Sequence, residues 1–177
     1  MNSRSGSPGK RLDYNFFRQD VLEVAPALIG KWLTVKYPCD KVSRLVIKEV
    51  EAYRGIEDLA CHARRGLTPR TEPMFCAGGI LYIYLVYGIH WMLNIVTGKQ
   101  NDPQAVLVRA AGDLYGPGRL TKSLGINSTY NHEDIVGSTR IWIEGPGEKL
   151  KMCTGPRIGV EYAGEYWSTI NWRFFTK

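Results

Sequence analysis

The sequence lacks the features that would place the protein in a membrane or mark it for secretion. Its longest apolar run, residues 80–97, is interrupted by Gly88, His90 and Asn94, and this makes it a poor membrane-spanning segment. Residues 1–10 are polar and contain no apolar segment of the kind that a secretory signal needs. We therefore expect a location in the cytoplasm or nucleoid (the nucleus in a eukaryote) and no membrane partner.

Cysteines are few and irregularly spaced. The chain has four, Cys39, Cys61, Cys76 and Cys153, and no two of them form a Cys-x-x-Cys pair. Structural zinc sites depend on such closely spaced pairs, so the sequence argues against a zinc site. In a reducing compartment we predict free thiols, with no metal and no cofactor.

The rest of the composition is that of an ordinary folded protein. Of the 177 residues, 44% are hydrophobic and 23% are charged, as is typical of globular domains. This length fits one domain with a substantial core. We expect that domain over residues 11–177, after a flexible arm of residues 1–10, and we expect a monomer. The formal net charge of +6 favours a polyanionic partner, although many basic proteins bind no nucleic acid.

Residues 80–97, ILYIYLVYGIHWMLNIVT, predict a β-hairpin. Tyr82 and Tyr84 are two residues apart and share one face of a strand. Tyr87 and Gly88 follow at the expected turn, where glycine accepts a positive φ. Two interpretations remain open: an aromatic-rich hairpin of the core, or one wall of a pocket for a flat polar ligand. The polar atoms of the tyrosines, His90 and Asn94 would need partners if buried.

A second predicted strand carries two carboxylates. Strict alternation over residues 44–53 places five side chains on one face: Leu45, Ile47, Glu49, Glu51 and Tyr53. Such acids either lie at the solvated end of a sheet or serve chemistry. In the predicted strand of residues 104–111, Arg109 is the lone charge. A buried arginine needs a carboxylate partner, and Glu51 is our candidate.

The segment between these strands is polar and basic. Residues 55–70 contain His62 and the arginines Arg64, Arg65 and Arg70. A solvated loop and a phosphate-contacting loop both fit this pattern.

Helix signals are fewer than strand signals. Asp20 is placed to cap a helix that Pro26 interrupts or restarts, and Gly116-Pro117-Gly118 opens a short helix that ends at Gly125. The prediction is an α+β fold, a mixed α/β single domain. It has a curved, mostly antiparallel sheet, flanking helices and a protruding β-hairpin.

Several sequence blocks, taken in order, resemble the alkyladenine (3-methyladenine) DNA glycosylase family. They span most of the chain from Val46 to Val160, and they read VEAYRGIEDLACHARRG, TPRTEPMFCAGGILYIYLVYG, LNIV, PQAVLVRA, GPGRLTKSLGI and GPRIGV. The resemblance implies a single mixed α/β domain whose hairpin projects into DNA. It also implies an enzyme of base-excision repair that acts on damaged purines in double-stranded DNA.

The same resemblance assigns roles by position. It makes Glu51 the general base that activates the attacking water, and Arg109 the residue that helps to hold that water and the glutamate. The residues that enclose the flipped purine are Tyr53, His62, Tyr84 and Asn94. Among these, Asn94 would screen against a guanine amino group. Tyr87 would be the wedge that fills the gap left in the duplex, and no lysine nucleophile is implied, so we expect a monofunctional enzyme that leaves an abasic site.

Two departures from the family pattern, and two other functions, also follow from the sequence. The connection from Ala111 to Gly116 is shorter than the basic, helical segment usual in the family, and Ile89 and His90 differ from the residues often found after the wedge. A non-catalytic nucleic-acid-binding protein would explain the tyrosines and arginines but gives Glu51 and Arg109 no role. A small-molecule-binding barrel would explain the aromatic residues but not the positive charge.

Overall fold

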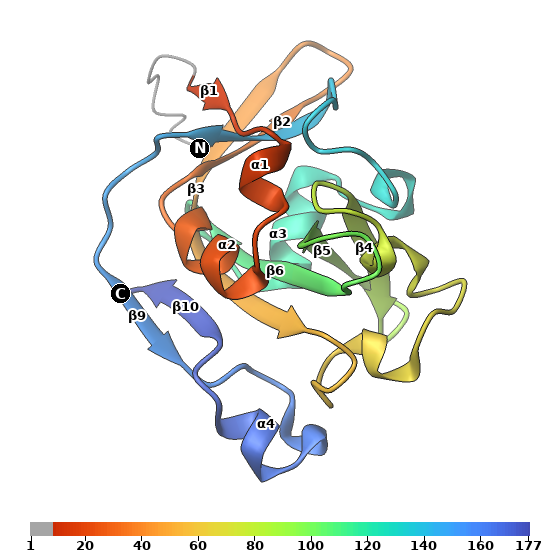
Figure 1. Cartoon of the computed structure of the whole chain (residues 1–177). Helices are drawn as coiled ribbons and strands as arrows, with labels where there is room; N and C mark the ends of the chain where they lie inside the picture. The colour runs from red at the N-terminus through yellow and green to blue at the C-terminus, as the bar shows by residue number, and fades with distance from the viewer. Residues whose placement is uncertain (1–8) are drawn as a thin grey trace.

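A computed structural model describes residues 9–177 of the chain (Figure 1). The helices are α1 (Tyr14–Phe17), α2 (Val21–Leu28), α3 (Pro117–Leu124) and α4 (Glu165–Thr169). The strands are β1 (Lys10–Arg11), β2 (Trp32–Lys36), β3 (Val42–Arg54), β4 (Leu81–Val86), β5 (His90–Thr97), β6 (Gln104–Ala111), β7 (Leu114–Tyr115), β8 (Ile141–Gly145), β9 (Met152–Gly155) and β10 (Arg173–Thr176). Four short 3-10 helices complete the elements, and the two used below are η1 (His62–Arg65) and η4 (Glu161–Ala163).

The described strands form one antiparallel sheet. Its order is β1-β8-β2-β3-β6-β5-β4, with β10 attached to β3, β9 to β10, and β7 to β6. Figure 1 shows the carboxy-terminal unit of β9, β10 and α4 at the end of the molecule opposite β1. The predicted α+β class with an antiparallel sheet is confirmed. The predicted arm of residues 1–10 lies mostly outside the described residues, but Lys10 is already paired with Gly145 of β8.

Two helices begin and end close to where the sequence predicts. The Asp20 side chain accepts a hydrogen bond from the Leu22 N–H and caps α2. The prediction that Pro26 interrupts this helix is wrong, because α2 continues through Pro26 to Leu28. Proline removes one backbone donor, and the buried apolar face of the helix outweighs that loss. Helix α3 ends at Gly125, which has a left-handed φ of 69°.

The predicted hairpin is formed by β4 and β5. Val86 pairs with His90 across the turn, and the Ile89 N–H donates to the Val86 carbonyl at 3.1 Å. Tyr87 and Gly88 have φ values of 52° and 70°, so both adopt the left-handed conformation of a tight hairpin turn. The turn position was therefore predictable from the Tyr-Gly pair.

Strand β3 does not keep the strict alternation that the sequence predicts. Its pairing with β6 shifts register on both sides of Glu49, which is the signature of a β-bulge. As a result Ile47 is buried in the core, whereas Glu49 and Glu51 both contact Arg109 on the other side of the sheet. The prediction that Ile47 shares a face with the two acids is wrong, because the bulge exchanges the two faces of the strand.

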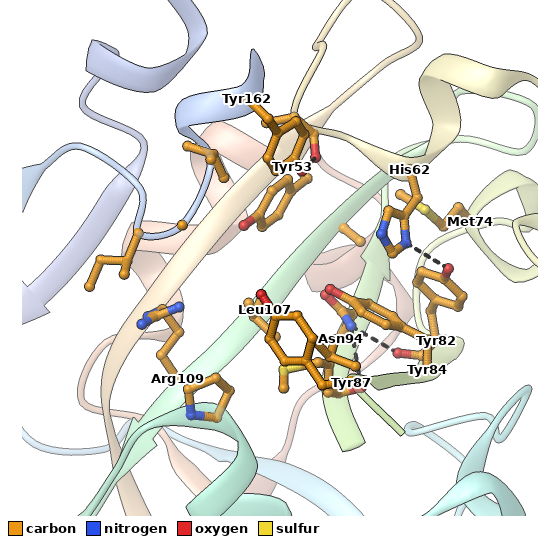
Figure 2. Close-up of a pocket in the computed structure, with 18 residues that line it drawn as sticks. Tyr53, His62, Met74, Tyr82, Tyr84, Tyr87, Asn94, Leu107, Arg109 and Tyr162 are labelled. Carbon is orange, nitrogen blue, oxygen red and sulfur yellow. Dashed lines mark hydrogen bonds between the residues drawn. The ribbon is translucent and has the colours of Figure 1, made fainter. Parts of the chain in front are cut away.

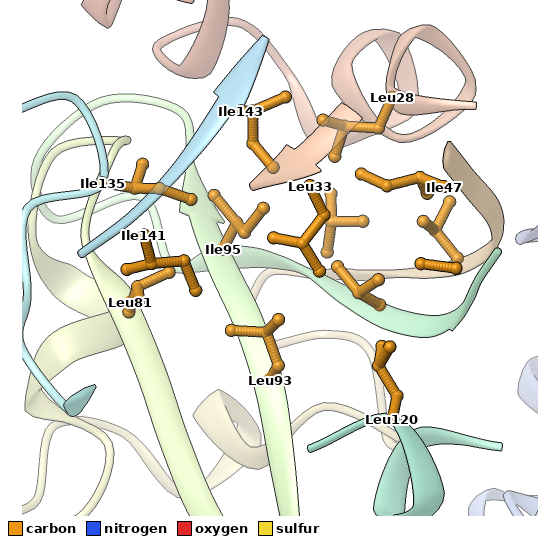
Figure 3. Close-up of a cluster of buried hydrophobic side chains, with 14 of the residues drawn as sticks. Leu28, Leu33, Ile47, Leu81, Leu93, Ile95, Leu120, Ile135, Ile141 and Ile143 are labelled. Carbon is orange, nitrogen blue, oxygen red and sulfur yellow. The ribbon is translucent and has the colours of Figure 1, made fainter. Parts of the chain in front are cut away.

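The main core lies on one side of the β3-β6-β5-β4 segment. Its strand residues are completely or almost completely buried, as Figure 3 shows for Ile47, Leu81, Leu93 and Ile95. Helices α2 and α3 cover this side, α2 against β3 and α3 against β5 and β6. The opposite side of the same four strands is therefore free to form a site. Within residues 9–177, no helix combines the length and apolarity needed to cross a membrane.

The short connection after Ala111 is a tight turn. Ala111 pairs with Leu114 and Ala110 with Tyr115, so only Gly112 and Asp113 separate β6 from β7. Gly112 has a φ of 57°, and Leu45 lies so close that an added side chain at Gly112 would collide with it. The chain thus passes directly from β6 to α3, and it places the start of α3 next to the hairpin.

Candidate active site

A cavity of about 350 Å³ opens on the side of the sheet opposite the core (Figure 2). Strand pairing aligns one row of residues across its base: Glu51 of β3 lies opposite Leu107 of β6, which lies opposite Asn94 of β5, which lies opposite Tyr82 of β4. Paired residues on adjacent strands share a face. Glu51, the predicted general base, and Tyr82 are therefore at opposite ends of one row, and the predicted pocket residue Asn94 lies between them.

Glu51 lies directly beneath the cavity and has no exposed surface. Its Oε1 accepts a hydrogen bond from the Ile158 N–H at 2.8 Å, and its Oε2 accepts one from the Tyr53 hydroxyl at 2.9 Å. Both of these donors line the cavity. Any molecule that reaches the carboxylate must therefore pass between the side chains that line the cavity above it.

Burial raises the pKa of the Glu51 carboxyl. The positive charge of Arg109 and the two hydrogen bonds act in the opposite direction, and the negative charge of Glu49 adds to the rise. An acid with a raised pKa takes up a proton more readily than an exposed glutamate does. That is the property expected of a group that accepts a proton from water.

Arg109 contacts the carboxylates of both Glu49 and Glu51. The sequence predicted Glu51 as the partner of this arginine. Its Nε lies 2.9 Å from Glu49 Oε1 and 3.4 Å from Glu51 Oε1, and its Nη1 donates to Glu51 Oε2 at 3.4 Å. The Glu51–Arg109 pairing is confirmed, and the structure adds the shorter contact with Glu49. Arg109 also lines the cavity, so one guanidinium joins the buried acids to the space where a ligand would bind.

Aromatic side chains from η1, β4 and β3 line the cavity. The His62 and Tyr84 ring centroids are 4.5 Å apart, and those of Tyr82 and Tyr84 are 5.1 Å apart. Tyr53 lines the same cavity from β3 (Figure 2). The structure therefore brings together the predicted Tyr53, His62 and Tyr84, and it adds Tyr82, which the site prediction omitted.

His62 is held in its neutral form. Burial, followed by the charges of Arg70, Arg65 and Arg64, lowers its pKa to about 4. Its Nδ1 lies 2.9 Å from the Tyr82 hydroxyl. A neutral imidazole has one donor and one acceptor nitrogen, so His62 can exchange a hydrogen bond with a polar ring edge without bringing a charge into the cavity.

Asn94 lies in the base of the cavity and is only 3% exposed. Its Nδ2 donates to the Tyr82 carbonyl at 3.1 Å and to the Met92 carbonyl at 3.4 Å. Both amide hydrogens are therefore directed to the backbone. The two strands fix the orientation of the side chain. Its Oδ1 is not used in these bonds and can restrict which ligands fit the cavity.

Tyr87 is 90% exposed at the turn of the hairpin and still lines the cavity mouth. Ile89, in the same turn, is 71% exposed. A large exposed aromatic ring contributes little to folding. Its position suggests a role in contact with a partner rather than in the core.

The three predicted arginines lie exposed around the cavity. The Arg70 guanidinium is 5.7 Å from the centre of the Tyr84 ring, and that of Arg64 is 5.7 Å from the centre of the Tyr162 ring. Together with Arg65 they are close enough to His62 to lower its pKa. These cations therefore give the cavity mouth a positive potential.

Three groups of the site were not predicted from the sequence. The Ile158 N–H is a backbone donor, and Tyr162 reaches the cavity from η4. Behind Tyr53, the fully buried Arg157 pairs with Asp58 at 2.5 and 2.9 Å, and its guanidinium lies 4.8 Å from the centre of the Tyr53 ring. The block GPRIGV contains Arg157 and Ile158, but a short block does not show which side chain or amide it contributes.

No cluster of three or more histidine, cysteine, aspartate or glutamate residues suitable for a metal ion occurs in residues 9–177. A buried acid, an arginine and a neutral histidine can transfer a proton and stabilise charge around a flat ligand.

Comparison with known proteins shows which family the chain resembles over most of its length. The family model for methylpurine-DNA glycosylase (MPG) matches residues 15–114 and 112–177, two segments that meet at the turn between β6 and β7. A Borreliella burgdorferi protein named "Putative 3-methyladenine DNA glycosylase" is 38% identical, over 94% of this chain and 96% of its own length. Proteins of the same name from Desulfitobacterium hafniense and Legionella pneumophila are 38% and 39% identical, each over 95% of its own length. The chain belongs to the methylpurine-DNA glycosylase family.

Proposed function

We propose that the protein is a DNA glycosylase that removes alkylated or deaminated purines from double-stranded DNA. The observation that carries this proposal is the position of Glu51. It is a buried acid that accepts hydrogen bonds from Tyr53, Arg109 and the Ile158 N–H, and all three of these residues line the aromatic cavity. The printed names of the relatives and of the family agree with this activity.

The target base would enter the cavity after leaving the DNA stack. A base in a duplex cannot be reached by a buried acid, and flipping it out costs a few kcal/mol. Tyr87 at the hairpin turn would offset part of that cost by filling the gap, provided that the hairpin protrudes into the minor groove. The flipped purine would then stack between Tyr53 on one side and His62 and Tyr84 on the other. Asn94 would disfavour, without excluding, guanine-type bases that carry a 2-amino group relative to adenine-type bases.

Bond cleavage would use water activated by Glu51. The carboxylate would take a proton from the water, and its negative charge would stabilise the oxocarbenium-like sugar of the transition state. Arg109 would hold the glutamate and the water in place. No lysine lines the cavity within residues 9–177, and we therefore propose a monofunctional enzyme that leaves an abasic site.

The surroundings of the cavity would bind the DNA backbone. Arg64, Arg65 and Arg70 are exposed beside it, and arginines of this kind bind phosphates without reading sequence. We propose that the protein acts as a monomer on double-stranded DNA in the cytoplasm or nucleoid.

The direct test measures release of a free purine from duplexes that contain one 7-methylguanine or one hypoxanthine, with enzyme in excess. Wild-type protein should release the base and leave an alkali-sensitive abasic site. Glu51→Gln keeps the shape of the side chain and removes the base. It should lower the single-turnover rate by about 10²–10⁴-fold, the usual contribution of a positioned general base, and leave DNA binding intact. Glu57→Gln, at an exposed glutamate near the end of β3, is the matched control and should leave the rate unchanged.

Other outcomes would reject the proposal. Salt-sensitive DNA binding without release of any base would identify a non-catalytic nucleic-acid-binding protein. Absence of DNA binding would favour a small-molecule-binding function for the cavity. Normal excision by Glu51→Gln would move the general base to another residue.

A further inference from the structure

Glu49 is a second carboxylate that the proposed mechanism does not use. It is 16% exposed in its side chain and is not among the residues that line the cavity. Its Oε1 accepts from Arg109 Nε at 2.9 Å and from Arg173 Nη1 at 3.3 Å. Glu49, a residue of β3, therefore connects Arg109 of β6 with Arg173 of β10.

Arg173 continues this connection to the loop that holds Glu51. Its Nε donates to the Pro156 carbonyl at 2.8 Å. Two residues later, the Ile158 N–H donates to Glu51 Oε1 at 2.8 Å. The position of that amide is therefore tied, through Arg173, to the carboxylate of Glu49.

These contacts close into a ring around Glu51. One half runs from Glu49 through Arg109 to Glu51, and the other runs from Glu49 through Arg173 and the loop before η4 to Glu51. Glu49 and Glu51 are two residues apart in β3 and contact Arg109 from the same face of the sheet, next to the β-bulge beyond which Ile47 faces the core. Of the donors to Glu51, Arg109 is bonded directly to Glu49, and the Ile158 N–H is connected to Glu49 through the Pro156 carbonyl and Arg173.

We propose that Glu49 is a positioning residue for the reaction, holding Arg109 and the Ile158 loop in the arrangement that orients Glu51. The inference rests on the proposed function and extends it, because it separates two acids that lie on one strand face. Glu51 touches the reacting water and is the catalytic residue. Glu49 acts through the two arginines.

The charge of Glu49 affects Glu51 as well as its position. As an anion Glu49 raises the pKa of Glu51, and Arg109 lowers it. Glu49 also accepts the hydrogen bond of Arg109 Nε, and this competition weakens the contact of Arg109 with Glu51. Removing the charge of Glu49 therefore lowers the pKa of Glu51 by both routes.

The other ionisable groups near Glu51 come from several elements and would stay unchanged. Tyr53 of β3 donates a hydrogen bond to it. Tyr84 of β4 and Arg157 of the loop before η4 interact with its charge. None of these three is joined to Glu49 by a hydrogen bond, so a change in titration after substitution of Glu49 reports on Arg109 and on Glu49 itself.

The test compares the pH dependence of single-turnover excision in wild type, Glu49→Gln and Glu49→Asp. A duplex with one 7-methylguanine is used, because this cationic base leaves without being protonated and the acid limb then reports on Glu51 alone. Glu49→Gln should move the acid limb to lower pH by about one unit, the scale of a single neighbouring charge. It should also lower the plateau rate by about tenfold, as loss of a supporting residue does, with unchanged DNA affinity. Glu49→Asp, which keeps the charge, should restore the position of the limb.

A limb that stays in place in Glu49→Gln would overturn the proposal, since a purely structural residue lowers the rate equally at every pH. A loss as large as that of Glu51→Gln would also overturn it and would point to Glu49 as the general base. Absence of excision by the wild type would instead reject the proposed function.

Arg173→Met offers a second test if Glu49→Gln does not fold. It should lower the plateau rate while leaving the acid limb close to that of wild type, because Glu49 keeps its charge and its contact with Arg109. An Arg173→Met rate equal to wild type would remove Arg173 from the ring.

Discussion

Strands β3, β6, β5 and β4 have two faces that differ in composition and in what they contact. One face is aliphatic, dry and covered by α2 and α3, and it consists of Val50, Ala52, Val106, Val108, Leu93, Ile95, Leu81 and Ile83. The other face has acids, an arginine, an amide and tyrosines, and it lines or supports the cavity. The two faces are formed by alternate residues of the same strands.

The difference shows where the stability of the fold comes from. Burial of apolar area is the main favourable contribution to folding, and the core face supplies it. Glu51 is buried on the other face although burial disfavours its charged form. The favourable burial of apolar side chains on the core face offsets the unfavourable burial of Glu51 on the other face.

Tyr87 gives the first way to test this division, with a larger expected effect on excision than a substitution of Asn94. Because the side chain is 90% exposed, Tyr87→Ala should leave the melting temperature nearly unchanged. It should weaken excision from duplex DNA by about 1–3 kcal/mol, the value of one base–aromatic stack, and most for lesions that still pair well. Thermal melting and single-turnover excision measure the two effects.

Two further variants make this test specific. Tyr87→Phe should keep most of the activity, because the ring and not the hydroxyl fills the gap in the duplex. Tyr82, on the same hairpin, is 1% exposed, and Tyr82→Ala should destabilise the protein by about 3–5 kcal/mol. A large fall in melting temperature for Tyr87→Ala would assign Tyr87 to the core and contradict its proposed role as the wedge that fills the gap in the duplex.

Asn94 tests the cavity face itself, with a smaller effect. Its Nδ2 is bonded to the Tyr82 and Met92 carbonyls, so the side chain has a fixed position in the base of the cavity. Asn94→Ser is smaller and should raise excision of guanine-type lesions relative to adenine-type lesions by about tenfold, the scale of one steric contact. Competition between 7-methylguanine and hypoxanthine duplexes gives the ratio. A constant ratio would make Asn94 a structural residue of the strand.

Much of the fold and part of the site were predictable from local sequence patterns. The hairpin and its Tyr-Gly turn, the cap at Asp20 and the Gly-Pro start of α3 each follow from a few neighbouring residues. The pairing of Arg109 with Glu51 followed from the cost of burying an arginine alone. These features depend on rules that act within one strand, helix or turn, or on a charge that must be paired.

What could not be predicted depends on contacts between distant segments. The bulge near Glu49 is set by pairing with β6, and alternation alone cannot locate it. The Ile158 N–H that holds Glu51 is a backbone group 107 residues away, and every residue except proline has such a donor. The pair of Arg157 and Asp58 is equally remote along the chain. Sequence therefore predicted candidate reactive residues more readily than the groups that orient them.

The most direct test of this account compares two adjacent residues of β3. Val50 and Glu51 are both fully buried, the first on the core face and the second beneath the cavity. Val50→Ala should lower stability by about 1–3 kcal/mol and retain excision at temperatures well below melting.

Glu51→Gln should behave in the opposite way. Because burial raises the pKa of Glu51 above its unfolded value, the stability contributed by the protonated acid is complete below the unfolded pKa and is lost as the pH rises through the folded pKa. At pH 8 the glutamine variant should therefore melt at or above the wild-type temperature while the excision rate falls by about 10²–10⁴-fold. A melting temperature lowered as far as that of Val50→Ala, with excision retained, would contradict the division of the two faces.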